Sequence, residues 1–472
     1  MHPERVLVYA LETAAIAMVV LALSVRGWRR TDRDQIAVAV AVGVACFLNS
    51  SLLLDVNPAR VGKAAVGLLV WLVLTALLVR LGYLLGASGE VRLALLIFAI
   101  GLLALPLLGY SQSRSEPDLV PIDAPGELTT PDARPNVYWL VLDGYARPDM
   151  LERFSGFDDG PFVADLAERG FQVSSSSLAS YPRTHLSLAS TLQMEYVLEE
   201  GHDVQDDYKL FAPVVVGRST TVARFRALGY DTAYGPAGGV EWAACREDLV
   251  DVCLPPKRPF PATGELESAL LDLTPLGMLH VPTPYSDPVR FAESVVGPSR
   301  PEEPFFAFQH LLSPHSPYRY RADCSPRSTP LAPSSFVEAR LPRYRTQVRC
   351  LNDLTLDAVD RIVERDPTAV IVIQSDHGTD HHFRWTDAPD TWTPSQVMER
   401  YGAFNAMRLP PGCEVPVEGQ PLVNTFRIVF ACIEGTEPDL LDYRGFAVPI
   451  DDIGGLKELE PERFEPGAVP SE

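Results

Sequence analysis

Residues 369–378 read AVIVIQSDHG, and residues 137–149 read VYWLVLDGYARPD. Each stretch opens with a short run rich in apolar side chains and then reaches an acid. A run of this length that is apolar on both faces predicts a strand inside a parallel sheet with helices on both sides. The acid that follows is expected at the carboxyl edge of the sheet, where reactive groups collect in open α/β folds.

Short apolar runs and helical patterns alternate through residues 136–450. Alternation of this kind predicts an α/β domain whose mostly parallel central sheet is covered on both faces. Besides the two stretches above, strands are expected at residues 171–173, 230–234 and 305–310, and helices at residues 162–169, 221–228 and 352–365. A further helix is expected to start at Thr184, within the sequence SYPRTHLSLASTLQMEY.

The first 110 residues form a separate region with four apolar stretches, each long enough to cross a bilayer. A cluster of arginines (Arg26, Arg29, Arg30 and Arg33) separates the first stretch from the second and places that loop in the cytoplasm. Four crossings then put the N-terminus and everything after residue 110 outside the cytoplasmic membrane. The four stretches comprise residues 6–25, 36–54, 64–85 and 91–108.

Two polar segments flank the predicted domain. Residues 111–135 are rich in Pro, Ser and acids and predict a linker, and the acidic residues 451–472 predict a poorly ordered tail. The chain carries a net charge of −21, and nine Lys or Arg stand against six Asp or Glu in its first 110 residues, which leaves roughly −24 for the rest. This acidity argues against nucleic acid as a partner, because nucleic-acid binding requires a basic surface.

Cysteine usage agrees with an exported domain. Cys46 lies in a predicted membrane span, and the other six cysteines all lie in the soluble part. An even number in an oxidising compartment predicts disulfides, although six cysteines allow fifteen connectivities and six free thiols in a cytosolic domain remain the alternative. Proximity in the sequence suggests the pairs Cys245–Cys253, Cys324–Cys350 and Cys413–Cys432.

Five residues are candidates for the chemistry. Asp143 follows the first strand, Asp376 and His377 follow AVIVIQ, and His315 follows the strand FFAFQH in the segment LLSPHSPY. Thr184 stands where a helix is expected to begin, and a hydroxyl there faces free N–H groups that bind phosphate or sulfate. The carboxylates, the imidazole and the hydroxyl together fit one divalent cation, zinc or manganese better than calcium or magnesium.

Each of these residues also has a structural interpretation. Asp143 with Gly144, and Asp376-His377 with Gly378, are typical of polar turns. Thr184 alone is more often a helix N-cap than a nucleophile. Only the combination favours a metal-activated nucleophile.

The residues from 136 to 196, the SPHSPY segment and the SDHG segment resemble the alkaline phosphatase/sulfatase superfamily. Within it, the resemblance is to the sulfatase-like group that contains lipoteichoic acid synthases and phosphoethanolamine transferases. It implies an alkaline phosphatase-like α/β/α sandwich in which Asp143, Thr184, Asp376 and His377 hold a single metal ion. It also implies that Thr184 is the nucleophile and that His315 contacts the transferred group.

The sequence departs from the pattern in four places. The first-strand acid is Asp143, where those transferases often have Glu, and four membrane spans are counted where relatives often carry five. Ser180-Tyr181-Pro182-Arg183 has its Arg one position too early for the C/S-x-P-x-R string of true sulfatases, so conversion to formylglycine is not expected. No Asp-x-x-x-His string occurs, which leaves out the second-metal set of alkaline phosphatases.

Four further residues are weaker candidates for substrate binding: Arg183, His185, His310 and His381. His382 is expected at the surface. The residues and the resemblance together predict a membrane-anchored enzyme that transfers a phospho-headgroup, of the phosphoethanolamine or glycerol phosphate type, from a phospholipid donor to a glycan or lipid acceptor of the cell envelope. Hydrolysis of a phosphoric or sulfuric ester at the same site, and non-catalytic binding, are the alternatives.

Overall fold

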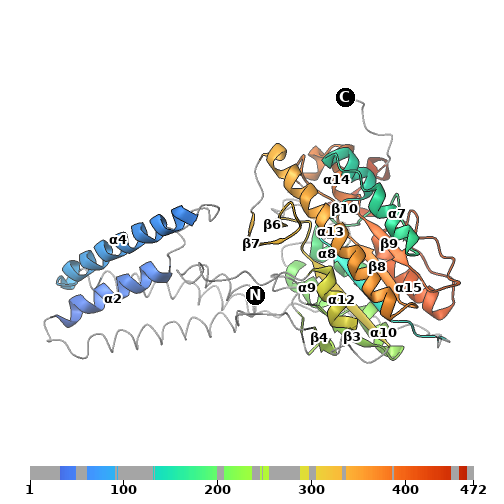
Figure 1. Cartoon of the computed structure of the whole chain (residues 1–472), viewed down its shortest axis with the longest axis horizontal. Helices are drawn as coiled ribbons and strands as arrows, with labels where there is room; N and C mark the ends of the chain where they lie inside the picture. The colour runs from blue at the N-terminus through green and yellow to red at the C-terminus, as the bar shows by residue number, and fades with distance from the viewer. Residues whose placement is uncertain are drawn as a thin grey trace. The chain divides into compact units, whose positions relative to one another are not determined.

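The computed structural model describes residues 32–48, 61–90, 93, 131, 133–198, 207–235, 245–246, 248–254, 287–296, 304–331, 336–384, 387–447 and 456–464. These residues divide into two compact units, one that holds α2 and α4 and another that holds every element from β1 onward. Figure 1 labels many of these elements along the chain.

The first unit contains two apolar helices. Helix α2 (Arg33–Leu48) covers much of the second predicted span, and α4 (Val61–Leu85) covers the third. The first predicted span and nearly all of the fourth lie outside the described residues. In the part of the chain that the structure describes, no helix combines the length and the apolarity that a membrane crossing requires. The four-helix membrane region therefore stays a prediction.

The second unit is built on a seven-stranded sheet in the order β2-β9-β8-β1-β5-β3-β4. The run from β8 to β4 is parallel, whereas β9 and β2 join its edge through antiparallel pairing. The mostly parallel sheet predicted from the apolar runs is thus confirmed. Its strands are β1 (Val137–Leu142), β2 (Gln172–Val173), β3 (Asp231–Tyr234), β4 (Val252–Cys253), β5 (Phe305–Leu311), β8 (Val370–Gln374) and β9 (Asn405–Arg408).

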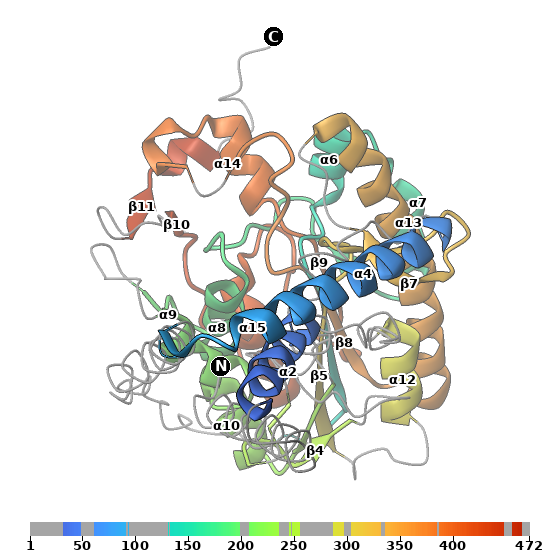
Figure 2. The same ribbon diagram turned by 90° about the vertical axis from the view of Figure 1, so that its left-hand side faces the viewer.

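Strand β1 divides the interior into two layers. Tyr138, Leu140 and Leu142 pack into a core with α7, α12, α13 and α14, and the alternate residues pack into a second core with α8, α9, α10 and α15. Figure 2 shows β5, β8 and β9 between α15 on one side and α12 and α13 on the other. Because successive side chains of a strand point to opposite faces, an all-apolar strand requires this cover on both sides.

The layer that contains Tyr138 uses α7 (Gly160–Glu168), α12 (Pro288–Val296), α13 (Val337–Arg365) and α14 (Pro394–Tyr401). The opposite layer uses α8 (Thr184–Gln193), α9 (Asp207–Val215), α10 (Thr220–Ala227) and α15 (Thr425–Glu434). Shorter elements are α6 (Pro148–Met150), η1 (Leu151–Ser155), β6 (Tyr318–Tyr320), β7 (Pro326–Leu331), η4 (Pro389–Thr391), η5 (Leu422–Asn424), β10 (Gly445–Ala447), β11 (Lys457–Leu459) and η6 (Pro461–Phe464).

Two sequence predictions need correction. Helix α13 begins at Val337 rather than at residue 352, because the first half of the helix carries arginines that hide its apolar period. Part of the predicted tail is ordered, since β11 pairs antiparallel with β10 and Phe464 packs into the core. Residues 451–455 and 465–472, and most of the linker at 111–135, lie outside the described residues.

Three disulfides join the cysteine pairs that sequence proximity suggested: Cys245–Cys253, Cys324–Cys350 and Cys413–Cys432. The alternative of six free thiols is therefore wrong for this structure. Cys324–Cys350 ties the β6–β7 hairpin to α13. Such links occur in proteins that fold in an oxidising compartment.

Candidate metal centre

Three neighbouring strands bring the candidate residues together. Asp143 follows β1, the middle strand, and β1 pairs in parallel with β5 on one side and β8 on the other. His310 lies on β5, and Asp376 and His377 follow β8 directly. Since the three strands run in the same direction, the residues at their carboxyl ends meet at one edge of the sheet.

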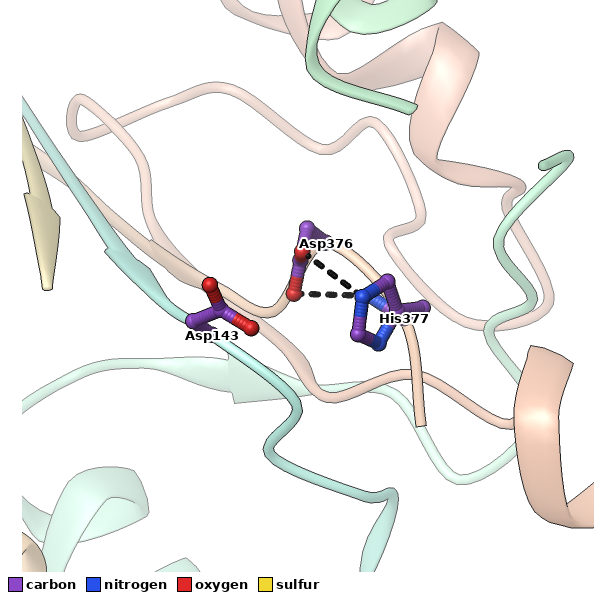
Figure 3. A group of neighbouring side chains, drawn as sticks. All are labelled: Asp143, Asp376 and His377. Carbon is purple, nitrogen blue, oxygen red and sulfur yellow. Dashed lines mark hydrogen bonds and ion pairs between the residues drawn. The ribbon is translucent and has the colours of Figure 1, made fainter. Parts of the chain in front are cut away.

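The closest group consists of Asp143, Asp376 and His377 (Figure 3). One ligand atom from each residue lies within 4.8 Å of those of the other two, and all three residues are buried. Within the described residues, this is the one group of three or more acids, histidines or cysteines with such spacing. The structure thus assembles from distant parts of the chain the three groups that the sequence singled out.

The protonation of His377 shows why the group fits a cation. Its Nδ1 lies 2.9 Å from the carbonyl oxygen of Gly378, so Nδ1 carries the proton and Nε2 presents a lone pair. That lone pair faces Asp376 Oδ2 at 3.1 Å. Burial, and then the nearby Arg400 charge, lower the pKa of His377, so the ring is neutral at pH 7.

Lone pairs that face each other in the interior repel unless a positive charge lies between them. Asp143 Oδ1 and Asp376 Oδ2 are both buried, and neither accepts a hydrogen bond from the described residues. Two carboxylate oxygens and an imidazole nitrogen are the donors that a borderline divalent cation binds. The hydrogen bond from His377 Nδ1 would fix the orientation of the ring, as is usual for a metal-binding histidine.

Asp143 is held as a carboxylate. Burial alone would raise its pKa, but the charge of His315 and the hydrogen bond and charge of His310 outweigh burial and leave the pKa well below the usual range, with a smaller contribution from His377 at the acidic pH where that ring is protonated. His310 Nε2 lies 3.2 Å from Asp143 Oδ2. The backbone N–H of His315 donates to the Asp143 carbonyl oxygen at 3.0 Å, and the side chain of His315 is exposed at the site.

Thr184 is the first residue of α8, where a helix start was predicted. Its Oγ1 lies 3.2 Å from His377 Nε2. Ser187, one turn later, donates its hydroxyl to the carbonyl oxygen of Asp376 at 2.6 Å and anchors the helix to the loop after β8. A half-buried hydroxyl therefore faces the metal-ligand group from a helix N-terminus, where backbone N–H groups favour an anion.

Gly144 connects the two acids. Its N–H donates to Asp376 Oδ1 at 2.9 Å, and its carbonyl oxygen accepts the Tyr344 hydroxyl at 2.8 Å. Gly144 has a φ of +67°, a conformation that residues with a Cβ rarely adopt. The glycine that sequence analysis could read as a plain turn thus sets the distance between Asp143 and Asp376.

Gly378 is required because of close backbone contacts. A Cβ at this position would clash with the carbonyl oxygens of Glu399 and Gly402. The Gly378 N–H donates to the Arg400 carbonyl oxygen at 2.7 Å. The end of α14 therefore presses directly against the loop that carries Asp376 and His377, and only glycine leaves room for it.

Arg400 is a site residue that the sequence did not reveal. Its guanidinium is buried and donates from Nε to the carbonyl oxygen of Pro182 at 3.0 Å, and Nη2 donates to the same oxygen. Pro182 lies two residues before Thr184. Arg400 thus connects the loop of the proposed nucleophile with the loop of the metal ligands, and the sequence MERYGAF carries no signal of this contact.

The weaker candidates differ in position. His310 contacts Asp143, as described above, and His381 is buried beside Tyr344, with ring centroids 4.6 Å apart. His185 is completely buried and Arg183 is half-buried at the N-cap of α8. Their predicted roles in substrate binding remain predictions. His382 is half-exposed and pairs with Glu399 at 3.2 Å, which agrees with its expected place at the surface.

Comparison with known proteins gives matches among solved structures, whereas no protein-family model and no curated protein matches the sequence. The C-terminal periplasmic domain of EcEptC from Escherichia coli is 13% identical, with a TM-score of 0.45 over 72% of this chain and 96% of that one. The same domain has been solved in complex with Zn.

Two other matches are a phosphonate monoester hydrolase of Agrobacterium radiobacter and the lipoteichoic acid synthase LtaP from Listeria monocytogenes. The hydrolase is 14% identical, with a TM-score of 0.42 over 66% of this chain and 80% of the hydrolase. LtaP is 12% identical, with a TM-score of 0.40 over 68% of this chain and 77% of LtaP. A further match, a protein in the alkaline phosphatase superfamily from Vibrio parahaemolyticus, is 13% identical, with a TM-score of 0.43 over 68% of this chain and 73% of that one.

Proposed function

We propose that this chain is a membrane-anchored, metal-dependent transferase that moves a phospho-headgroup from a lipid donor to a hydroxyl of an envelope glycan or lipid. The observation that carries the proposal is the position of Thr184. Its hydroxyl faces His377 Nε2 at 3.2 Å, beside the buried oxygens of Asp143 and Asp376.

Four groups of the chain would hold one divalent cation: the carboxylates of Asp143 and Asp376, His377 Nε2 and Thr184 Oγ1. Zinc or manganese fits this set better than calcium or magnesium, because an imidazole takes part. Such a cation lowers the pKa of a bound hydroxyl and neutralises charge on a phosphoryl oxygen.

The reaction would proceed in two displacements. In the first, Thr184 loses its hydroxyl proton to solvent, its oxygen bonds to phosphorus, the bond from phosphorus to the lipid oxygen breaks, and the lipid alcohol takes a proton that His315 can donate. In the second, an acceptor hydroxyl attacks phosphorus and passes its proton to His315. The bond from phosphorus to the Thr184 oxygen breaks, and that oxygen takes up a proton from solvent. The N–H groups at the start of α8 would stabilise the phosphoryl oxygens in both steps.

The lipid donor and the external location rest on the four predicted spans. A site beside the bilayer meets a lipid-borne substrate at high effective concentration. The three disulfides support a catalytic domain in an oxidising compartment outside the cytoplasm.

The test uses the purified full-length protein, loaded with Zn²⁺ or Mn²⁺ and given a panel of phospholipids with and without acceptor. Mass spectrometry is expected to find the headgroup on the peptide that contains Thr184, and release of the headgroup is expected to depend on the acceptor. The Thr184→Ala variant should lose turnover by about 10³-fold or more and should retain the metal ion.

Release to water alone, at a rate that no acceptor changes, would replace transfer with hydrolysis. If the protein binds no stoichiometric dication, or if Asp376→Asn binds it as tightly as the native chain, the metal-dependent proposal is wrong. A protein that binds the metal but turns over none of the lipids is then a binding protein with this fold.

A further inference from the structure

The first half of α13 is basic and leads to the metal centre. Residues 336–352 contain four arginines and one acid, in a chain with a net charge of −21. Tyr344, in the middle of this stretch, donates its hydroxyl to the carbonyl oxygen of Gly144, the residue after Asp143. The arginine one turn before it, Arg340, contacts the segment that follows Asp376 and His377, through the carbonyl oxygen of His381.

Arg340 is half-buried and lacks an acidic partner among the described residues. Its Nη2 donates to the carbonyl oxygen of His381 at 2.8 Å. Its Nε is buried and has no hydrogen-bond partner in the described part of the chain. The guanidinium thus keeps donor capacity that the protein does not use.

His381 offers further unused hydrogen-bonding capacity. The residue is only 6% exposed, and neither ring nitrogen bonds to another described residue. Its backbone is fixed at both ends, by Arg340 at the carbonyl oxygen and by Glu399 Oε1 at the N–H, 2.7 Å away. Burial outweighs the charges of Glu399 and Asp380 and lowers the pKa of His381 to about 4, so the ring is neutral at pH 7 and offers one N–H.

A buried polar atom without a partner requires an explanation, such as a water molecule, an ion or a ligand that completes its hydrogen bonds. The charges of two acids, Glu399 and Asp380, act on His381, and Asp380 also acts on Tyr318. No ion pair joins Asp380 to Arg340 within the described residues. The unused donors therefore favour an anion from outside the chain.

We propose that Arg340 and His381 form a second anion subsite, which binds a phosphate group other than the one that Thr184 attacks. This inference rests on the proposed function, since it assigns to that site a substrate or acceptor with two phosphates in reach. A guanidinium with a free N–H and a neutral imidazole N–H suit phosphate oxygens, which accept several charge-assisted hydrogen bonds. The second phosphate belongs either to a donor lipid or to a phosphorylated acceptor.

Binding is measured first, with no turnover. Full-length Thr184→Ala protein in detergent micelles with Mn²⁺ is titrated by calorimetry with inorganic phosphate and with alkane-α,ω-bisphosphates of two to six carbons. A ligand whose two phosphates reach both the metal centre and the second subsite binds more tightly than a ligand with one phosphate. We expect the best bisphosphate to bind about tenfold more tightly than inorganic phosphate.

Replacing Arg340 separates the subsite from the metal centre. In Arg340→Gln on the same background, the advantage of the bisphosphate is expected to fall below about threefold, whereas the affinity for inorganic phosphate stays unchanged. Arg340→Lys keeps the charge and should retain part of the advantage, which guards against a folding defect. Arg349→Gln is the matched control, because Arg349 is an exposed arginine of the same helix that donates to the Ala322 carbonyl oxygen.

Steady-state kinetics then identify the source of the phosphate. If Arg340→Gln raises KM for cardiolipin, which has two phosphates, but not for phosphatidylglycerol, the donor carries the second phosphate. If it raises KM for glycerol phosphate but not for glycerol as acceptor, the acceptor carries it. Either result supports the subsite.

Two results overturn the inference: a bisphosphate that binds no better than phosphate, or an advantage that survives in Arg340→Gln. The proposed function fails separately. If the native protein turns over no phospholipid while the bisphosphate advantage depends on Arg340, the subsite stands and the transferase proposal does not.

Discussion

At the residue scale, Arg400 places the nucleophile relative to the metal ligands. Its side chain holds the Pro182 carbonyl oxygen, and its own carbonyl oxygen holds the Gly378 N–H. An arginine with this pair of contacts couples Thr184 to His377 without touching the substrate. It is therefore a positioning residue.

Arg400→Gln is expected to lower kcat by about 10²-fold, because a shift of about 1 Å in a reacting group costs that much. Metal affinity should not weaken, since a buried positive charge near Asp376 and Asp143 disappears. Steady-state assays measure kcat, and titration with a competing chelator measures the metal affinity. The control is Arg427→Gln. Arg427 lies on α15 and, like Arg400, donates to a backbone carbonyl oxygen, that of Met194, at 2.7 Å. An equal loss in both variants, or loss of metal in Arg400→Gln, contradicts the positioning role.

The sequence indicated Asp143, Thr184, Asp376 and His377 because each stands at a strand end or a helix start, where local patterns are strong. It could not indicate Arg400, Tyr344 or Ser187. Their contacts join elements far apart in the chain, and an arginine or tyrosine inside a helix looks the same whether it meets solvent or a metal-binding loop. His310 was named only as a weak candidate, although it contacts Asp143.

At the scale of elements, a buried network fastens β1 to α7 and α13. The hydroxyl of Tyr145 lies 3.0 and 2.9 Å from the two carboxyl oxygens of Asp159 and 2.6 Å from Asn352 Oδ1. The amide of Asn352 donates to Asp159 at 2.7 Å. Burial raises the pKa of Asp159 to about 7, despite the hydrogen bonds from Asn352 and Tyr145.

This shift makes stability depend on pH. The folded form keeps its proton up to about pH 7, whereas an unfolded chain loses it near 3.8. The stabilising contribution is therefore complete below pH 3.8 and is lost as the pH rises to about 7. Between these values the free energy of unfolding should fall by about 1.4 kcal/mol per pH unit from this residue.

Asp159→Asn is expected to remove that slope. Pulse proteolysis or thermal melting of the metal-saturated protein between pH 4.5 and about 7 measures it. Asp158→Asn is the control: Asp158 is exposed and its Oδ1 accepts the Gly160 N–H at 2.9 Å, and because its charge adds to the raised pKa of Asp159, this variant should keep the slope and only lower the pH at which the slope ends. The same slope in native protein and Asp159→Asn would show that Asp159 is ionised in the folded state.

Strong local patterns made the three central strands of the sheet predictable. The strand at 137–142 was predicted with the bounds that it has, and those at 305–310 and 369–374 within one residue of them. Strand β9 and helices α14 and α15 were not predicted, because they follow loops of mixed composition. The extra fifteen residues of α13 include Pro342, which ordinarily argues against a helix interior.

At the scale of the whole molecule, the predicted topology places both the N-terminus and the catalytic domain outside. In intact spheroplasts, protease added to the medium is expected to digest the domain, and a cytoplasmic marker protein should survive. Immunoblots with antibodies against the domain measure this. Protection of the domain until the cells are lysed contradicts the orientation, which depends on one cluster of arginines between residues 26 and 33.

The central position of β1 has a consequence for how the site responds to metal removal. Backbone hydrogen bonds join β1 to β5 and β8 along its length, so its amide protons can exchange with solvent only when the sheet itself opens. Chelation should therefore speed deuterium uptake in the loop after β8 and at the start of α8, and leave β1 slow. In the apoprotein Asp143 would stay in place at the end of β1, whereas the loop that carries Asp376 and His377 would become more mobile, and a returning cation would order that loop again.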